Sequence, residues 1–253
     1  MHGDSHSPAA WSAVRAAEWR PGLAGDGAAH GEIFASGHDA AGAALALALA
    51  QDRMRVAAGD PLAPAPGEQA WLWVQDAATI RLTGRPCRAG LPATLRHRLI
   101  HVAAKTPEDA LFALEEGLRC RDLAFAIGEI AGNPRALGLT ASRRLGLMVE
   151  RHGVPLWLVR IDARRDLGSA RMRWQAAAAP SPPPCWNAQA PGTASWRAEL
   201  FRARAHPCGE WILRDDGQTL LADRSPDIAS LAAATPHPGD LADAAGAGSL
   251  AAG

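Results

Sequence analysis

The residues with the clearest potential for chemistry lie in a glycine-bounded turn that follows a short apolar strand. Gly37 and Gly42 are separated by four residues, which is the spacing of the two glycines in a phosphate-binding P-loop. In a P-loop the next two positions are a lysine, which contacts the phosphates, and a serine or threonine, which holds Mg²⁺. Here those positions are Ala43 and Ala44. We therefore expect loop geometry without nucleotide binding.

Two neighbouring residues bear on this interpretation. Asp39 would place a negative charge where phosphate oxygens would lie. A weak ATPase would need a substitute cation near the loop, and the sequence supplies only His38. An ordinary strand-to-helix turn explains the two glycines as well, because glycine is the default turn residue.

Two carboxylates follow apolar runs that are typical of buried strands. Asp76 comes just after residues 70–74, AWLWV, and Glu129 lies near the end of residues 123–130, LAFAIGEI. Catalytic carboxylates of α/β enzymes occupy such strand ends. Without the lysine, we expect Asp76 to cap the next helix and Glu129 to be a capped or solvated carboxylate rather than a metal ligand.

Metal and disulfide chemistry are not expected. His97 and His101 fall in a segment that we interpret as extended, where four residues span roughly 13 Å, too far to share one ion. The cysteines are far apart, without a Cys-x-x-Cys pair: Cys87, Cys120, Cys185 and Cys208. With no signal peptide visible and no apolar run of about 20 residues, we expect a cytoplasmic protein with no metal or cofactor.

Strand and helix patterns alternate along the middle of the chain and predict an α/β fold with a mostly parallel sheet. We expect an N-terminal helix and linker over residues 1–28, a core over residues 29–215 and a largely disordered tail over residues 216–253. The N-terminal helix could pack on its own domain or on a neighbouring subunit. Predicted strands are Glu32–Ala35, Ala70–Val74, Leu99–Val102, Leu123–Ile130 and Val154–Ile161, with helices after Gly42, from Thr106 and over Thr140–His152.

The end of the core changes character to an antiparallel ribbon. Residues 172–176, 196–205 and 210–214 are the predicted strands. Residues 134–214 carry 13 Arg and 5 acidic residues, a balance that suits nucleic acid or an acidic partner. Tryptophans at strand positions are usually core. The candidates for contact with DNA or a partner are Arg171, Arg173, Trp174, Arg202 and Arg204.

Taken together, these segments resemble the RecA core, and more closely the ImuA family, RecA-like and SulA-like proteins of bacterial inducible mutagenesis cassettes. The resemblance covers roughly residues 29–215. The segments that carry it are LPATLRHRLIHVAAKTPEDALFALEEGLRC, IGEIAG, TASRRL, HGVPLWLVR, SARMRW and ELFRARAHPCGEWIL.

The resemblance implies a non-catalytic accessory protein of an error-prone translesion DNA synthesis complex of the SOS response. Its expected partners are an ImuB-like Y-family polymerase homologue, RecA, and an error-prone C-family polymerase through the complex. Direct contact with DNA, and association with the nucleoid when assembled, are further expectations. The alternatives are a SulA-type inhibitor of cell division and a weak RecA-like ATPase. The missing lysine argues against the ATPase, and the Arg-rich C-terminal ribbon favours the ImuA-like interpretation over the inhibitor.

Overall fold

The computed structural model of this chain describes residues 29–57, 68–187, 189–204, 206–217 and 219–224. The predicted N-terminal helix and linker lie outside these residues, and so does the tail beyond residue 224. No helix in the described part of the chain is long and apolar enough to cross a membrane.

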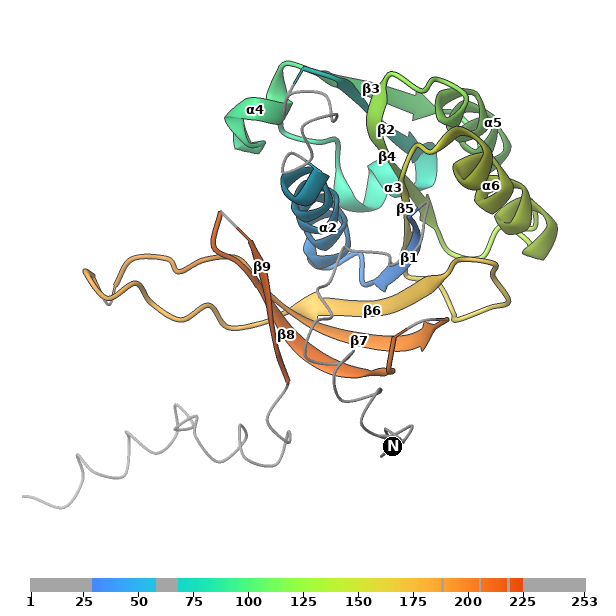
Figure 1. Cartoon of the computed structure of the whole chain (residues 1–253). Coiled ribbons are helices and arrows are strands. Elements are labelled where there is room, and N and C mark those ends of the chain that lie inside the picture. Colours follow the sequence, from blue (N-terminus) through green and yellow to red (C-terminus); the bar gives the residue numbers. More distant parts are fainter. Residues whose placement is uncertain (1–28, 58–67, 188, 205, 218, 225–253) are drawn as a thin grey trace, which may run out of the picture. The chain divides into compact units, whose positions relative to one another are not determined.

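Within the described residues, nine strands form one sheet in the order β3-β2-β4-β5-β1-β6-β7-β8-β9 (Figure 1). The pairs from β3 to β6 are parallel, whereas β6–β7 and β7–β8 are antiparallel. The predicted α/β class, with a mostly parallel sheet, flanking helices and antiparallel C-terminal strands, is confirmed. The strands are β1 His30–Ala35, β2 Ala70–Asp76, β3 Leu99–Ala104, β4 Leu123–Ala131, β5 Leu156–Ile161, β6 Met172–Ala178, β7 Ser195–Ala203, β8 Gly209–Asp215 and β9 Leu220–Arg224.

The helices cover both faces of the parallel part of the sheet (Figure 1). Helices α2 and α4 pack on one face in a core that contains most of the buried tryptophans, and α5 and α6 pack on the other in a core rich in leucine. The short helix α3 follows β2 directly. The helices are α2 Ala41–Ala57, α3 Ala77–Thr83, α4 Ala93–Arg96, α5 Pro107–Leu118 and α6 Leu139–His152, with a 3₁₀ turn at Arg88–Gly90.

Local sequence signals set several helix ends. Thr106 caps α5 in a capping box with Asp109, and Pro107 occupies the first turn. Asp76 caps α3 by accepting from the Thr79 amide, as predicted. The left-handed Gly153, with a φ of 78°, ends α6.

The antiparallel strands β7, β8 and β9 continue the sheet past the part that α5 and α6 cover (Figure 1). Between β6 and β7 the register shifts: Arg173 pairs with Arg202, and Trp174 pairs with Leu200, so that Phe201 is the extra residue of a bulge. The outermost strand β9 falls in a segment predicted to be disordered.

Strand β9 forms because a tight turn and one buried leucine compensate for the polar composition of this segment. Gly217 takes a φ of 86° in the turn, and Asp216 accepts from the Thr219 amide at 2.6 Å. Leu220 is buried, and its amide donates to Asp52 on α2 at 3.0 Å.

Candidate functional site

The turn that resembles a P-loop connects β1 to α2, and its amides bind carboxylates of the chain itself. The Gly37 amide donates to Asp162 Oδ1 at 2.9 Å, and the Ala41 amide donates to Asp39 Oδ1 at 2.8 Å. In a P-loop, such amides and the helix N-terminus bind phosphate oxygens. The two carboxylates therefore occupy donors that a phosphate would need, and their charge repels an anion.

Asp162 reaches the turn because β5 ends beside β1. Its amide donates to Ala35 O at 2.9 Å, and its φ of 50° lies in the left-handed region. Aspartate adopts that region more readily than most residues. A Cβ on Gly37 would lie 2.7 Å from Asp162 Oδ2, so Gly37 allows the carboxylate to approach the loop.

Gly42 has a packing role. A Cβ at this position would lie 2.7 Å from the Ala35 Cβ and 2.8 Å from Val159 Cγ1. The glycine therefore lets α2 pack closely against β1 and β5. Of the two alanines that replace the P-loop lysine and hydroxyl residue, Ala43 lines a neighbouring cavity, and Ala44 packs against the core.

The cavity lies at the carboxyl ends of the parallel strands, between the turn, β2, β4 and the end of α3, and has a volume of about 360 Å³. This is where ligands bind in open α/β sheets. Its apolar walls include Leu82 and Ile161. Its polar and aromatic lining includes His38, Asp39, Trp73, Gln75, Arg85 and Glu129.

Glu129 is the buried carboxyl group of the cavity. Its side chain is 1% exposed, so it is not the solvated carboxylate that was one of the two expectations for this residue. Trp73 Nε1 donates to Oε1 at 2.5 Å, and Gln75 Nε2 donates to Oε2 at 3.3 Å. Burial raises the pKa of Glu129 to about 7, although these hydrogen bonds and one with Thr83 act in the opposite direction.

Gln75 extends this hydrogen-bond network to the neighbouring strand. Its Nε2 also donates to Gly84 O at 3.0 Å, and its Oε1 lies 3.0 Å from His101 Nε2 on β3. Burial and the nearby charges of Arg85 and Arg88 lower the pKa of His101. His101 therefore belongs to the cavity network, whereas His97 ends α4. No group of three or more potential metal ligands occurs among the described residues.

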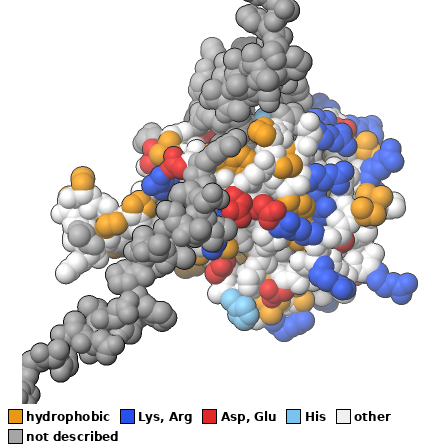
Figure 2. Space-filling view, turned by 90° about the horizontal axis from the view of Figure 1, so that it is seen from below, with side chains coloured by type: hydrophobic (Ala, Val, Ile, Leu, Met, Phe, Trp, Pro, Cys, Tyr) orange, Lys and Arg blue, Asp and Glu red, His pale blue; other side chains and the backbone are white. Residues whose placement is uncertain are grey.

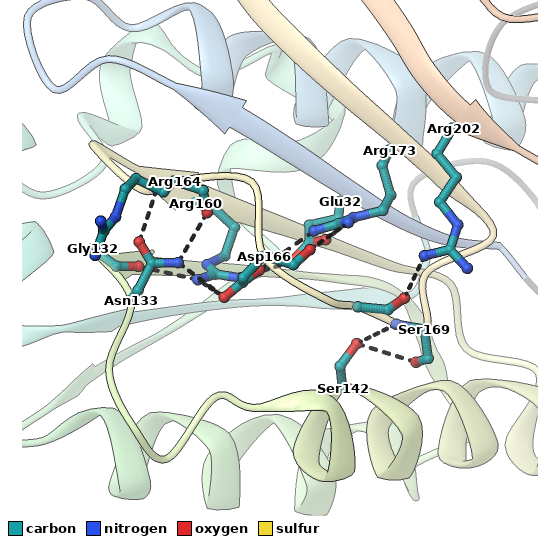
Figure 3. Close-up of polar contacts among 11 residues, drawn as sticks. Glu32, Gly132, Asn133, Ser142, Arg160, Arg164, Asp166, Ser169, Arg173 and Arg202 are labelled. Carbon is teal, nitrogen blue, oxygen red and sulfur yellow. Dashed lines mark hydrogen bonds and ion pairs between the residues drawn. The ribbon is translucent and has the colours of Figure 1, made fainter.

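A second polar cluster lies on the α6 side of the sheet, under the antiparallel strands (Figure 3). Glu32 on β1 accepts from two buried arginines: Arg160 Nη1 at 2.9 Å and Arg173 Nε at 2.5 Å. Arg160 also bonds both carboxylate oxygens of Asp166 at 3.2 Å. Both guanidinium groups lie over the ring of Phe34, 5.4 Å and 5.1 Å from its centre.

These ion pairs hold the segment that leads from β5 to β6. Asn133 Nδ2 donates to Asp166 Oδ2 at 2.9 Å, and Arg173 Nη1 donates to Asp166 O at 2.7 Å. Burial alone would raise the pKa of Asp166, but hydrogen bonds from Arg160 and Asn133 lower it below its usual value.

The five candidates for contact with DNA or a partner fall into different environments. Trp174 is 0% exposed in the core, and Arg173 is 4% exposed and bound to Glu32. Neither side chain is available at the surface. Successive residues of β6 point to opposite faces of the sheet, and both faces are covered here: Arg173 binds Glu32 on one, and Trp174 packs in the core on the other. Arg171 pairs with Glu150 at 2.8 Å. Arg202, which donates to Gly168 O at 2.9 Å, and Arg204 are exposed.

The sequence alone did not predict several residues of the two clusters, because their contacts join distant segments. Asp162 lies 125 residues from Gly37, and Arg160 lies 128 residues from Glu32, so no local spacing connects them. One signal was present in the sequence. Glu32 and Arg160 are charged residues within otherwise apolar strands, which is the pattern of a buried ion pair.

Comparisons with known proteins do not assign this chain to a family. Neither the scan against protein-family models nor the search of curated proteins finds a match for this chain.

Proposed function

We propose that this chain is a non-catalytic, RecA-like accessory protein of an error-prone translesion DNA synthesis complex, and that it acts by binding protein partners. The strand order β3-β2-β4-β5-β1-β6 with parallel pairing is compatible with a RecA-like core. The partner assignment rests on the resemblance of the sequence to the ImuA family.

The observation that carries the non-catalytic part of the proposal is the closure of the P-loop-like turn. The Gly37 and Ala41 amides already donate to Asp162 and Asp39. A bound nucleotide would have to displace both carboxylates without a lysine to neutralise its charge. Hydrogen bonds to charged groups contribute about 1.5–3 kcal/mol each, so the exchange is unfavourable.

The cavity chemistry supports the same conclusion. A carboxyl with a pKa near 7 can exchange a proton at neutral pH. Both oxygens of Glu129 are engaged by Trp73 and Gln75. The turn itself carries no lysine or arginine, and Arg85, near the end of α3, is the one such cation among the described residues that line the cavity. We infer that the cavity is a remnant of a nucleotide site rather than a working one.

Co-purification of the full chain with the ImuB-like protein and with RecA of the same organism tests this proposal. An ATP and ADP titration with Mg²⁺ would be run on the same preparations. The expected result is a stable complex with the ImuB-like protein and no heat of nucleotide binding. ATP turnover without capture of either partner would contradict it.

A further inference from the structure

The segment of residues 162–169, here called the β5–β6 loop, is exposed at its tip. Polar contacts fix it along its length (Figure 3). Asn133 accepts from the Arg164 amide at 2.8 Å and donates to the Arg164 carbonyl at 2.9 Å. Ser142 Oγ on α6 accepts from the Ser169 amide at 2.9 Å. The Gly168 carbonyl accepts from Arg202 at 2.9 Å. Contacts from the β4–α6 connection, α6 and β7 therefore hold the loop in one conformation.

The buried ion pairs are part of the same support. Asp166 anchors the loop to Arg160 and Arg173, which meet at Glu32. A Cβ on Gly168 would lie 3.0 Å from Glu32 Oε2 and 3.3 Å from the Arg173 guanidinium carbon, so a glycine allows this close approach. Burying such charges carries a large desolvation cost. A surface loop held in this way is preorganised, which reduces the entropy that binding would lose.

The side chains that this support presents to solvent are apolar and cationic. Leu167 lies between the anchored residues Asp166 and Gly168 and is 74% exposed. Arg164 is exposed, and its guanidinium has no hydrogen-bond or ion-pair partner within the part of the chain that the structure describes. Arg165 is exposed as well and pairs with Glu199.

The start of α6 borders the same surface. Leu139, one turn before the loop-binding Ser142, is 50% exposed. Arg143 is also exposed. In the view from below in Figure 2, basic side chains gather on one side of the molecule, with hydrophobic and acidic ones between them. Exposed leucines among arginines are typical of a surface that binds protein.

The aromatic chemistry of this surface does not favour a single-stranded nucleic acid. Such ligands stack their bases on free aromatic faces. The ring of Phe201 lies beside the loop, and the guanidinium of Arg165 covers it at 4.1 Å from the ring centre. Glu199 and Glu150 also neutralise Arg165 and Arg171. A surface of exposed arginines and leucines without a free aromatic ring among its described residues suits a peptide whose carboxylates flank an apolar side chain. It suits a single-stranded nucleic acid less well.

We propose that the β5–β6 loop, together with Leu139 and Arg143, is a docking surface for an acidic, leucine-containing segment of a partner protein. An apolar side chain of the segment packs on Leu167, and its carboxylates pair with Arg164 and Arg143. This inference deepens the proposed function, since it names the surface through which the accessory protein binds. It replaces Arg173 and Trp174, which are buried, with residues that are accessible.

The test uses full-length protein with Leu167→Asp and Arg164→Glu, two exposed positions whose side chains make no hydrogen bond or ion pair with the described residues of the loop support. Phe112→Asp is the matched control, because Phe112 is 66% exposed on α5, away from the loop. Two labelled probes of equal length are titrated by fluorescence anisotropy. One is a peptide of alternating leucine and aspartate or glutamate, and the other is oligothymidylate. The variants are also co-purified with the ImuB-like protein.

We expect the peptide to bind more tightly than oligothymidylate and its affinity to fall with added salt. Leu167→Asp and Arg164→Glu should each weaken peptide binding about tenfold, while Phe112→Asp leaves it unchanged. Oligothymidylate that binds as tightly as the peptide would identify a nucleic-acid surface and overturn the inference. Equal peptide affinity in all variants would overturn it as well.

The partner arm separates failure of this inference from failure of the proposed function. If the Leu167→Asp variant captures the ImuB-like protein as efficiently as the wild-type protein does, the docking surface is overturned and the proposed function stands. If the wild-type protein captures neither partner, the proposed function fails. The peptide titration then still decides whether the surface binds acidic protein segments.

Discussion

Glu32 and Glu129 are both glutamates of central parallel strands, and each is 1% exposed, yet the chain surrounds them differently. Glu32 meets two guanidinium groups, whereas Glu129 meets only neutral donors, the Trp73 indole and the Gln75 amide. Neutral donors do not compensate for burial of a full charge, and the pKa of Glu129 rises to about 7. At equal burial, the hydrogen-bond and ion-pair partners of a strand carboxyl therefore decide whether its charge is compensated.

The two regions also differ in what surrounds each carboxyl. The ion pairs of Glu32 fix an exposed loop that carries Leu167 and Arg164. The cavity that contains Glu129 lies beside a turn whose amides are occupied by the chain's own carboxylates. We propose that the first region presents a binding surface, and that the second no longer binds an anionic ligand through its turn amides, although Arg85 lines the cavity.

The largest expected effect is at Glu32. Glu32→Gln leaves the buried Arg160 and Arg173 with only Asp166, among the described residues, as a counter-charge. Breaking a buried ion pair costs about 3–5 kcal/mol. We expect a loss of that order in the free energy of unfolding, measured by urea denaturation. The matched control is Glu199→Gln, which removes the surface partner of Arg165 and should cost less than about 1 kcal/mol. Equal losses in the two variants would contradict the contrast between them.

The next effect concerns pH and Glu129. Because its pKa is raised from 4.5 to about 7 in the folded protein, the folded state binds a proton more tightly than the unfolded state. This contribution to stability is present below about pH 4.5 and is lost as the pH rises to about 7, by an amount of up to about 3 kcal/mol. Glu129→Gln should remove it, so the variant gains stability relative to wild type between pH 5 and pH 8.

His30 makes the variant necessary, because its effect has the opposite sign. Burial lowers the pKa of His30 to about 4, so its contribution is lost as the pH falls below 6.5. The two effects partly cancel in the wild-type protein. Denaturation of wild type and Glu129→Gln at both pH values isolates the carboxyl. A difference that does not change with pH would show that Glu129 titrates normally.

A smaller effect is expected at Trp73. Trp73→Phe keeps an aromatic ring, although a smaller one, and removes the indole donor to Glu129 Oε1. An unsatisfied buried acceptor costs about 1–3 kcal/mol. Loss of a donor to the carboxylate should also raise the pKa of Glu129 further. Thermal unfolding at pH 5 and pH 8 measures both consequences. We expect a larger loss of stability at pH 8 than at pH 5, and the reverse order would contradict the proposed role of the indole.

The sequence predicted the features that depend on neighbours along the chain. Asp76 caps α3, Thr106 caps α5 and Gly153 ends α6, because each signal lies within a few residues of its effect. The alternation of apolar strands with helices predicted the fold class for the same reason. Strand β9 was missed, since it depends on one leucine that contacts the core of another segment.

The candidate site could be predicted only in part, because its contacts join distant segments. Gly37, Gly42 and Ala43 identified the turn, but the carboxylate that closes it comes from the end of another strand. Arg173 was predicted to contact DNA or a partner because it is a cation of the C-terminal strands. Its pairing with Glu32, 141 residues away, depends on β1 and β6 being neighbours in the sheet.

The central claim is that the P-loop-like turn is closed to nucleotides by its own carboxylates and by the missing lysine. The most direct test is an isothermal titration of Mg²⁺–ATP into wild type and into a double variant, Asp162→Asn with Ala43→Lys. We predict no binding to the wild-type protein. The double variant, which weakens the competing carboxylate and restores the cation, should bind detectably. Micromolar binding of ATP to the wild-type turn, abolished by a bulky residue at Gly37, would contradict the account.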